Sequence, residues 1–498
     1  MEIVATFVPS GRGDAAPEIS RPPAGATVTE LRADILGVGD DLAGLVAASP
    51  LPVVLTLRST AEGGRGPDGG ADRRRFFKQA AALPAAFFDL EAARDRELVD
   101  ALVPREKVIL SAHFTGGVPG DLEERAAAML ASGTRFVKVV PAAARIADVR
   151  AVLRLAHALD RGSRRDRRAV VFASGEAGRA TRLLGPLFGA PLAYAAWAPG
   201  RHGAAGQFLP HELESLIGHL TGRPRRVFAV LGSQVGGSLS PDMHAAAYRA
   251  LGLPHAFVPL EIREVGELDE LLVPAGESWL DDLSLPAGGF AVTMPWKGEA
   301  ARRCTVLAPR AERAGAANTV LPRADKVLGD CTDMDGITRS LADDGAQLAG
   351  ARALVLGAGG AARAAVVALQ LAGCDVAVAA RDSGRGQEMA RALQAEASDL
   401  NASEQATVVV NATPAGADGA SSSFLERLRL PAGGVVVDLP YGEAPTFLEQ
   451  LAGRRGWRYV SGRSVLLYQA VSQFAAMTGA PPPVRAMAAA LGLEDGGA

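Results

Sequence analysis

The sequence predicts an α/β protein in which a (β/α)8 barrel is followed by a two-domain α/β unit. Two observations support this prediction. In the first 200 residues, eight short strand-like runs alternate for the most part with helical patterns, as in a closed parallel barrel. Much further along, residues 353–365 pass from an apolar run through Gly357, Gly359 and Gly360 into an alanine-rich segment, which predicts a strand, a tight turn and a helix.

Length and composition indicate a large folded protein. The chain has 498 residues, enough for roughly three domains of ordinary size, and 48% of them are apolar. Its net charge of −3 argues against a nucleic-acid or anionic-membrane partner. The short basic blocks at residues 73–75 and 164–168 are therefore interpreted as solvated helix faces.

The three cysteines indicate the compartment. Cys304, Cys331 and Cys374 are odd in number and widely spaced, which indicates neither a disulfide framework nor a zinc site. We expect no metal and a location in the reducing cytoplasm. The first residues lack the pattern of an export signal, and no run of about 18 apolar residues predicts a membrane span.

The predicted barrel elements follow in order along the chain. Residues 9–27 contain Pro17, Pro22 and Pro23, so the first barrel helix is predicted to be missing or reduced to a loop. A last helical pattern is followed at residues 221–226 by a glycine, a proline and three arginines, which indicates the end of a domain. The first domain is therefore predicted to comprise residues 1–222. The strands are predicted at residues 3–8, 28–31, 53–57, 86–90, 108–111, 136–140, 169–173 and 192–197, and the helices at 72–83, 121–131, 146–159, 179–187 and 211–220.

Polar residues near the carboxyl ends of these strands are informative, because parallel barrel strands are buried on both faces. Lys138 places an ammonium in an otherwise apolar strand, where desolvation favours the free amine as a nucleophile toward a carbonyl. His113 and Glu91 follow neighbouring strands and would supply a base and a group that orients it. The structural alternatives are a snorkelling lysine and a histidine satisfied within the fold. The full set is Glu30, Arg32, Arg58, Glu91, His113, Lys138, Arg182 and Gln207.

Over most of this domain the chain resembles the type I 3-dehydroquinate dehydratases. The matching stretches are residues 29–34, 55–59, 62–64, 88–91, 111–113, 137–138, 179–182 and 206–207. The resemblance implies that Lys138 forms an imine with the substrate and that His113, oriented by Glu91, removes a proton from the adjacent carbon and then helps to expel water. The hydroxyls and carboxylate of the substrate would be held by Glu30, Arg32, Arg58, Arg182 and Gln207.

The chain departs from this family at one loop. Members usually carry Ser-Ala-Pro before the Gly206-Gln207 pair, where this chain has Gly203-Ala-Ala205, so one serine contact on the closing loop is lost. Together with the reduced first helix, this departure allows slower turnover without implying loss of the chemistry.

The second half carries its own polar residues after strand-like segments. A fresh strand at residues 227–231 leads to Ser238 and Ser240, which a turn and a helix N-cap would also explain. Further on, Lys297, Asn318 and Asp333 each follow a strand-like segment.

The glycine turn at residues 357–360 predicts a phosphate cradle. Glycines let the backbone approach a pyrophosphate closely, and the start of the following helix faces the anion. An empty α/β connection is the alternative. The next strand, at 375–380, ends not in a carboxylate for a ribose 2′-hydroxyl but in Arg381, with Ser383 and Arg385 beyond it. The sequence therefore favours NADP over NAD, although Asp382 opposes this choice.

These stretches resemble the shikimate dehydrogenases, and the resemblance covers essentially all of residues 226–498. It implies that Lys297 and Asp333 form the catalytic pair that gives or takes the proton as hydride moves between the nicotinamide and a ring carbonyl. Alternatively, Asp333 caps a helix and Lys297 is a surface charge. The implied substrate-binding residues are Ser238, Ser240, Thr293, Asn318, Tyr441 and Gln469, and the cofactor-binding ones are Gly357, Ala358, Gly359, Gly360, Ala361, Arg381, Ser383, Arg385, Asn411, Thr413 and Gly462.

Two departures and a domain division accompany this resemblance. Ala291 stands where many members have asparagine, and Gly236-Gly237 where a histidine often precedes the first serine. Serine at both 238 and 240 favours shikimate over quinate. We expect a substrate-binding domain at 226–345, completed by helices at 466–498, and an NADP-binding Rossmann domain at 346–465, with the active site in the cleft between them.

Together the two resemblances imply consecutive steps of aromatic amino acid biosynthesis: dehydration of 3-dehydroquinate, then NADPH-dependent reduction of 3-dehydroshikimate to shikimate. The expected partners are these small molecules, with no nucleic acid and no membrane. Two alternatives stay open. One is a different pair of enzymes, either a lysine-imine aldolase fused to a quinate dehydrogenase or a dehydratase fused to a quinate/shikimate dehydrogenase of broader specificity. The other is a non-catalytic sensor of pathway intermediates, which predicts loss of Lys138, His113, Lys297 or Asp333.

Overall fold

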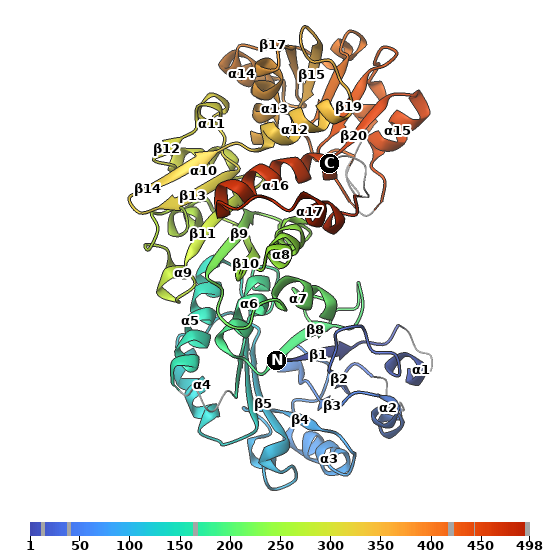
Figure 1. The fold of residues 1–498 in the computed structure, drawn as a ribbon. Helices are drawn as coiled ribbons and strands as arrows, with labels where there is room; N and C mark the ends of the chain where they lie inside the picture. The colour runs from blue at the N-terminus through green and yellow to red at the C-terminus, as the bar shows by residue number, and fades with distance from the viewer. Residues whose placement is uncertain (11–14, 37–40, 163–167, 417–422, 443, 494–498) are drawn as a thin grey trace. The chain divides into compact units, whose positions relative to one another are not determined.

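The computed structural model describes residues 1–10, 15–36, 41–162, 168–416, 423–442 and 444–493. The chain divides into two compact units (Figure 1). The first comprises residues 1–225 together with 258–262, and the second comprises residues 226–257 and 263–498. Within the described residues, none of the helices combines the length and the apolar character needed to cross a bilayer.

The first unit is an eight-stranded parallel sheet curled into a barrel, as predicted. The strands pair in the order β7-β6-β5-β4-β3-β2-β1-β8, so that β1 lies between β2 and β8. All eight predicted strands are confirmed to within three residues at each end: β1 (Glu2–Phe7), β2 (Val28–Arg32), β3 (Val53–Thr56), β4 (Phe87–Glu91), β5 (Val108–Phe114), β6 (Phe136–Pro141), β7 (Ala169–Val171) and β8 (Leu192–Ala196).

The connections of the barrel vary in length. In the first connection the described residues form only a four-residue helix, which confirms the predicted reduction. Its Glu18 pairs with Arg201 of the loop after β8, and its Ile19 is fully buried, so this short helix is packed onto the first unit. The helices are α1 (Ala16–Ile19), α2 (Leu42–Ala48), α3 (Gly70–Ala80), α4 (Leu122–Leu130), α5 (Ile146–Gly162), α6 (Arg179–Leu184) and α7 (Pro210–Ile217), and between β4 and β5 stand only the 3-10 turns η2 (Arg96–Leu98) and η3 (Arg105–Lys107).

One prediction about α3 is wrong. The three arginines 73–75 were expected on a solvated face, but Arg73 is fully buried while Arg74 and Arg75 are exposed. Arg73 shares the inner face of the helix with Phe77 and Ala80, four and seven residues further on. Of the other basic block, residues 163–167 lie outside the described residues.

The barrel interior changes from apolar to polar along the strands. Residues two apart share a face of a strand, so the register that pairs Ser111 with Lys138 and with Glu91 places these three side chains at one level. Nearer the amino ends of the strands lies an apolar floor. The cluster that includes this floor is Val4, Val28, Val54, Ile109, Phe136, Val140, Val170, Phe172, Leu192 and Tyr194.

After the barrel the chain forms a mixed six-stranded sheet ordered β10-β9-β11-β13-β14-β12, which belongs to the second unit except for the end of β10 from residue 258 on. β9 and β11 are parallel, and β13 runs antiparallel to both β11 and β14. Its elements are β9 (Arg226–Gly232), α8 (Ser240–Leu251), β10 (His255–Glu261), η5 (Val265–Glu270), α9 (Trp279–Asp282), β11 (Ala287–Val292), α10 (Lys297–Arg303), β12 (Val306–Leu307), α11 (Pro309–Ala314), β13 (Thr319–Arg323), β14 (Lys326–Asp330) and α12 (Asp333–Asp343).

The second sheet is parallel throughout and is ordered β17-β16-β15-β18-β19-β20. This is the doubly wound order, in which the chain reverses direction across the sheet between β15 and β18, and ligands bind at the carboxyl ends of the strands there. Its elements are β15 (Arg352–Leu356), α13 (Gly360–Leu371), β16 (Asp375–Ala379), α14 (Ser383–Leu393), β17 (Glu396–Ala397), β18 (Val408–Asn411), β19 (Val435–Asp438), α15 (Phe447–Arg455), β20 (Arg458–Ser461), α16 (Gly462–Thr478) and α17 (Val484–Ala490).

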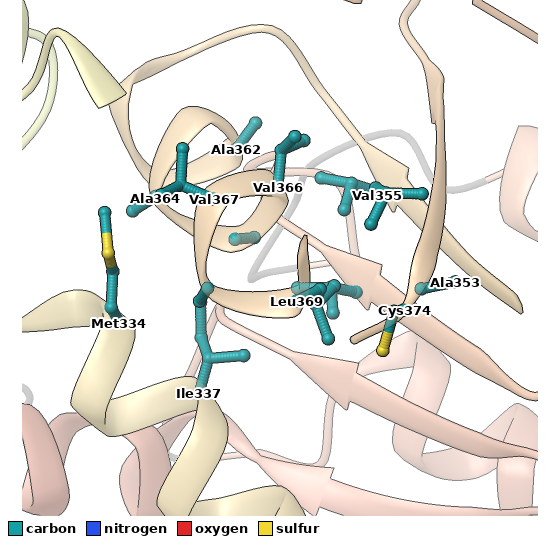
Figure 2. Packing of buried hydrophobic residues seen from close by; sticks show 14 of the residues in the cluster. Met334, Ile337, Ala353, Val355, Ala362, Ala364, Val366, Val367, Leu369 and Cys374 are labelled. Atoms are coloured by element: carbon teal, nitrogen blue, oxygen red, sulfur yellow. The ribbon is translucent and has the colours of Figure 1, made fainter. Parts of the chain in front are cut away.

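The two sheets of the second unit share apolar cores. Figure 2 shows Met334 and Ile337 of α12 on one side of α13 and Val355 of β15 on the other, all in one buried cluster. Residues of the C-terminal helices, among them Leu467 and Phe474, pack with Phe228 of β9 in a second cluster. The segment that follows the nucleotide-type sheet therefore builds the core of the first sheet.

Candidate active sites

Lys138 lies inside the barrel and is almost completely buried. The strand around it is apolar as predicted, but carboxylates stand beside the ammonium. Its Nζ is 2.5 Å from Oδ2 of Asp89 and 3.7 Å from Oε1 of Glu30, and it stands 4.3 Å from the ring centre of Tyr194. Asp89, which contacts Lys138, is a residue that the sequence analysis missed, although it lies two residues before Glu91 and on the same face of β4.

The carboxylate in contact with His113 is that of Glu62 and not, as expected, that of Glu91. Oε2 of Glu62 accepts a hydrogen bond from the backbone N–H of His113 at 2.9 Å and lies 3.1 Å from its Nδ1. Glu91 points elsewhere: its Oε1 accepts from the backbone N–H of Ser59 at 2.8 Å and from Nη1 of Arg58 at 3.1 Å. The expected contact from Glu91 to His113 is therefore replaced by one from the 3-10 turn η1 (Thr60–Glu62), which follows β3.

Burial and charge set the protonation of this cluster. Burial, together with the positive charges of Arg58 and Lys138, holds the pKa of His113 well below 6.5, so the imidazole is neutral and able to accept a proton. Burial raises the pKa of Glu62 to about 7, against the opposing pull of Arg58. Burial alone would raise the pKa of Asp89, but Arg58 and Lys138 hold it well below its ordinary value.

Glu30 is held between two hydroxyls that the sequence analysis also missed. Thr6 Oγ1 donates to one of its oxygens at 2.8 Å and Thr56 Oγ1 donates to the other at 2.9 Å. Nε2 of Gln207 donates to Thr6 at 3.3 Å, while its Oε1 accepts from the backbone N–H of Gly203 at 2.8 Å. A Cβ at position 203 would meet the methyl group of Thr6 at 2.5 Å, so glycine fits where the family usually has serine.

The two remaining barrel arginines differ in their partners. Arg32 donates through Nε and Nη2 to both oxygens of Asp34, each at 2.8 Å. Arg182 is buried with its guanidinium 4.6 Å from the ring centre of Phe172, and among the described residues none accepts a hydrogen bond from its Nε. Burial lowers the pKa of Arg182 to about 9. Unlike Arg32, Arg182 therefore has no carboxylate at hydrogen-bond distance among the described residues.

In the second unit, four predicted residues meet in one hydrogen-bonded group. Lys297 Nζ donates to Oδ2 of Asp333 at 2.5 Å. Nδ2 of Asn318 donates to Oδ1 of Asp333 and to Oε1 of Gln469, each at 3.0 Å. Lys297 begins α10, Asp333 begins α12 and Gln469 comes from α16. Because both oxygens of Asp333 are engaged by side chains of other elements, the carboxylate holds a lysine rather than capping its own helix.

The other predicted substrate residues of this unit lie on neighbouring elements. Ser238 Oγ accepts from the backbone N–H of Ser240 at 3.3 Å, so the turn expected as the structural alternative exists at the start of α8. Tyr441 follows β19 and lies near Ser238, and burial raises the pKa of its phenol. Thr293 follows β11. A Cβ on Gly232 would come within 2.4 Å of the methyl group of Thr293, so Thr293 packs directly against the end of β9.

The glycine turn is built for close backbone approach. Gly357 has a φ of +117°, which favours glycine, and Gly359 precedes the first turn of α13 with open space around its Cα. A Cβ on Gly360 would meet Cβ of Lys297 at 2.7 Å, so the turn touches the lysine of the four-residue group. Ala358 and Ala361 complete this small-residue turn. The arrangement fits a dinucleotide pyrophosphate at the helix N-terminus.

The end of β16 is open to solvent. Arg381, Ser383 and Arg385 are all exposed there. Asp382, the charge that opposed NADP, is the N-cap of α14, and its Oδ1 accepts from the backbone N–H of Arg385 at 3.1 Å. The helix start thus uses the carboxylate, and the guanidiniums remain available to a 2′-phosphate.

Asn411 ends β18, and the methyl group of Thr413, two residues further on, lies beside Gly357 of the glycine turn. Oδ1 of Asn411 accepts from Thr413 Oγ1 at 2.7 Å, and its Nδ2 donates to the fully buried Asp438 at 2.8 Å. Carbonyl oxygens of residues 438–440 lie within 3 Å of where a Cβ on Gly462 would stand, so the backbones pack directly. Asp438 also accepts from Thr446 Oγ1 at 2.6 Å.

The pKa of Asp438 leads to a prediction about stability. Burial raises this pKa to about 6, so the folded chain binds the proton more tightly than the unfolded chain does, and the free energy of unfolding falls as pH rises from 4 to 6. Asp438→Asn keeps an acceptor for Asn411 and a donor for Thr446. We expect the variant to gain roughly 1 kcal/mol relative to wild type between pH 5 and pH 7. Urea unfolding of the second unit measures this free energy, and Asp375→Asn, at an exposed position, is the control. A stability difference between Asp438→Asn and wild type that stays the same from pH 5 to pH 7 would contradict the prediction.

Each of the two units holds a lysine paired with an aspartate at 2.5 Å, as an enzyme active site would. The first has the architecture of an imine-forming barrel lyase, and the second that of a nicotinamide-dependent oxidoreductase. The family model for type I 3-dehydroquinase matches residues 7–223. The models for the shikimate dehydrogenase substrate binding domain and the shikimate 5'-dehydrogenase C-terminal domain match residues 230–320 and 462–491. The chain belongs to the shikimate dehydrogenase family over its second unit and carries a type I 3-dehydroquinase domain in its first.

Individual relatives agree with this assignment. A shikimate dehydrogenase (NADP(+)) of Anaeromyxobacter dehalogenans is 38% identical, over 56% of this chain and 99% of its own length. The bifunctional 3-dehydroquinate dehydratase/shikimate dehydrogenase, chloroplastic, of Arabidopsis thaliana is 28% identical over 92% of this chain and 79% of its own length. The pentafunctional AROM polypeptide of Kluyveromyces lactis is 30% identical over 89% of this chain, which spans only 29% of that polypeptide.

Proposed function

We propose that the chain catalyses two consecutive reactions, dehydration of 3-dehydroquinate to 3-dehydroshikimate in the first unit and NADPH-dependent reduction of 3-dehydroshikimate to shikimate in the second. The observation that carries the proposal is that one chain holds both a buried strand lysine close to a neutral histidine and a lysine–aspartate pair against a dinucleotide-type glycine turn. The product of the first reaction is the substrate of the second, as in the bifunctional Arabidopsis relative.

In the first unit, Lys138 Nζ attacks the ring carbonyl of the substrate, and water leaves as the imine forms. His113, neutral and held by Glu62, removes a proton from the adjacent carbon and passes it to the departing hydroxyl, which leaves as water. A second water then hydrolyses the imine and frees Lys138. Asp89, ionised beside Nζ, fixes the position of the lysine through this sequence.

Substrate binding in the barrel depends on the charges around Lys138. Arg182 is suited to the substrate carboxylate, because its buried guanidinium has an aromatic ring and backbone as its nearest partners. We assign Glu30, Arg32, Arg58 and Gln207 to the hydroxyls. Gln207 already ties the loop at 203–204 to β1, so the loop closes on the substrate without the missing serine.

In the second unit, the glycine turn at residues 357–360 would hold NADPH, which when bound would supply hydride for the ring carbonyl of 3-dehydroshikimate. Lys297 protonates the oxygen as negative charge develops on it, and Asp333 holds the ammonium in place and favours its charged form. We assign Ser238 and Ser240 to the substrate carboxylate, Thr293, Asn318 and Gln469 to the ring hydroxyls, and Tyr441 to the lining of the site. The cofactor choice is supported by the exposed Arg381 and Arg385 and by the NADP(+)-named relative.

One experiment tests both halves of the proposal. The full chain is incubated with 3-dehydroquinate and NADPH while the enone absorbance of 3-dehydroshikimate and the oxidation of the nicotinamide are followed together. We expect the enone to appear and then to be consumed as NADPH is oxidised. No enone from 3-dehydroquinate would overturn the first half, and no NADPH oxidation with added 3-dehydroshikimate would overturn the second. Quinate with NADP tests the broader specificity in the same assay, and a sensor without catalysis would give neither signal.

The cofactor assignment gives a prediction of its own. Arg381→Ala should raise the KM for NADPH roughly tenfold and leave the KM for NADH unchanged, because only NADPH carries the 2′-phosphate that a guanidinium would bind. Steady-state kinetics with both cofactors measure this. The control is Arg391→Ala, at the other end of α14 and also exposed. Equal KM values for the two cofactors in the wild-type chain would contradict the assignment.

For the compartment, we propose the cytoplasm, because the three cysteines are free in the structure and suit a reducing environment.

A further inference from the structure

A continuous chain of buried, oppositely charged side chains runs from the barrel lysine to helix α3. We call it the buried ion-pair chain. Its links are Lys138 to Asp89 at 2.5 Å, Asp89 to Arg58 at 2.7 Å, Arg58 to Glu91 at 3.1 Å, Glu91 to Arg73 at 3.5 Å and Arg73 to Asp95 at 2.5 Å. Every member is at most 3% exposed. The proposed reaction uses the Lys138 end and gives no role to the Arg73 and Asp95 end.

Arg73 is fixed on all sides of its guanidinium. Nε and Nη2 donate to the two oxygens of Asp95 at 2.7 and 2.5 Å, and Nη1 donates to the backbone carbonyl of Pro67 at 3.1 Å. Asp95 in turn accepts from the backbone N–H of Glu91 at 2.8 Å. The pair therefore holds Glu91 by its backbone, through Asp95, and by its charge, through Arg73.

Glu91 transmits this position to the catalytic end. Its Oε1 accepts from the backbone N–H of Ser59 and from Arg58 Nη1, so it fixes the start of η1. Arg58 Nη1 also donates to Oε2 of Glu62 at 3.2 Å, and the same oxygen contacts His113 at its backbone N–H and its ring. Only Glu91, Arg58 and Glu62 stand between Arg73 and the proposed base.

Stability does not account for such a pair. Burying a guanidinium and a carboxylate costs desolvation energy that their attraction barely repays, and an apolar pair of similar size is often equally or more stable. Arg73 sits at a helix position whose periodic neighbours are Phe77 and Ala80, where an apolar residue would pack without that cost.

We propose that Arg73 and Asp95 are positioning residues of the dehydration site: they fix Glu91, and through it Arg58 and Glu62, so that His113 faces the substrate imine in its reactive orientation. The inference rests on the proposed dehydratase function and adds two residues that touch neither the substrate nor the reacting atoms.

The charge of each partner supplies a readout that a merely structural role would not move. Glu62 is faced by Arg58 after β3, by Arg94, Glu91 and Asp89 from the β4 segment and by His113 on β5, and the negative charge of Glu91 raises its pKa. Removing the positive charge of Arg73 leaves the negative charge of Glu91 less neutralised, which should raise the pKa of Glu62 further. The acid limb of the kcat profile should therefore move to higher pH. Removing the negative charge of Asp95 should move it to lower pH. Each shift should be roughly half a unit to one unit.

The experiment measures kcat, KM and the pH profile of dehydration in the full chain for Arg73→Met, Asp95→Asn and the double variant. The 3-dehydroshikimate reductase activity of the same preparation normalises for the amount of intact chain, thermal unfolding of the first unit reports on the fold of the barrel, and Arg75→Met, an exposed arginine on the same helix, is the matched control. We expect kcat to fall roughly 10- to 100-fold in all three variants, as misplaced catalytic groups do. The limb should shift in opposite directions in the single variants and return to the wild-type position in the double variant.

The possible outcomes are distinct. Wild-type kcat and pH profile in the variants, or a limb that shifts the same way in both single variants, would overturn the inference. If Arg73→Met does not fold, Asp95→Asn and the charge-free double variant decide it in the same way. A wild-type chain that fails to dehydrate 3-dehydroquinate would instead overturn the proposed function, and the inference with it.

Discussion

Lys138→Met should abolish dehydration of 3-dehydroquinate while reduction of 3-dehydroshikimate by the same chain continues at the wild-type rate. Removing the nucleophile removes the covalent route, a loss on the order of 10⁴-fold or more. The second activity should persist because the two compact units have separate apolar clusters. Asp89 keeps its pairing with Arg58 at 2.7 Å when the lysine is gone, so the barrel retains a partner for this carboxylate.

Chemical trapping identifies the lysine directly. Borohydride added to the wild-type chain with 3-dehydroshikimate should reduce the imine and add one ligand mass to the peptide that contains Lys138. Lys78→Met, an exposed lysine on α3, is the control and should change neither the trapped mass nor the rate. A ligand mass on another peptide, or a Lys138→Met variant that still dehydrates, would refute the imine assignment.

The barrel and the places of its site residues could be predicted because both follow from periodicity. Strands with apolar residues on both faces define the sheet, and a parallel sheet brings all carboxyl ends to one edge. Lys138, His113 and Glu30 were found in this way, as polar residues where a buried strand needs none. Thr6 and Thr56 obey the same rule and hold Glu30, but a hydroxyl in a strand is too common to stand out.

The partner of His113 could not be predicted in the same way. Glu91 ends a strand next to that of His113, whereas Glu62 lies in a 3-10 turn whose position over the barrel depends on Arg58. Such a turn has no periodicity to read. For Arg73 the signal was present: its spacing of four and seven residues from Phe77 and Ala80 marks the buried face of α3. Because Arg74 and Arg75 are adjacent to Arg73 and are exposed, all three arginines were assigned to the solvated face.

The nucleotide-binding end shows a similar limit. The sequence alone gives Asp382 as a charge that opposes the 2′-phosphate, yet the same aspartate stands directly before the helical pattern, where an N-cap is expected. The structure uses it as the cap. Local hydrogen bonding decided the role of that carboxylate, and the sequence offered both roles.

In the reductase, Lys297 and Asp333 should behave as one unit. Lys297→Ala and Asp333→Ala should each lower kcat far more than they raise the KM for 3-dehydroshikimate, because the proton is needed only as negative charge develops on the oxygen. The double variant should lose little more than the worse single variant, since residues that act together are non-additive. The 2.5 Å contact between Nζ and Oδ2 is the physical reason: without the carboxylate the ammonium is no longer held toward the substrate.

The competing explanation is structural and predicts different numbers. If Asp333 only supported the start of α12, Asp333→Ala would cost about 1 kcal/mol of stability and leave turnover near normal. The measurement is kcat, KM and the thermal midpoint for both single variants and the double variant, with Lys326→Ala at an exposed strand position as the control. A destabilised but active Asp333→Ala variant would disprove the coupled pair, and so would losses in kcat that multiply in the double variant. Asn318 should then also be tested, because its amide bonds to the same carboxylate and would keep Asp333 in place when the lysine is removed.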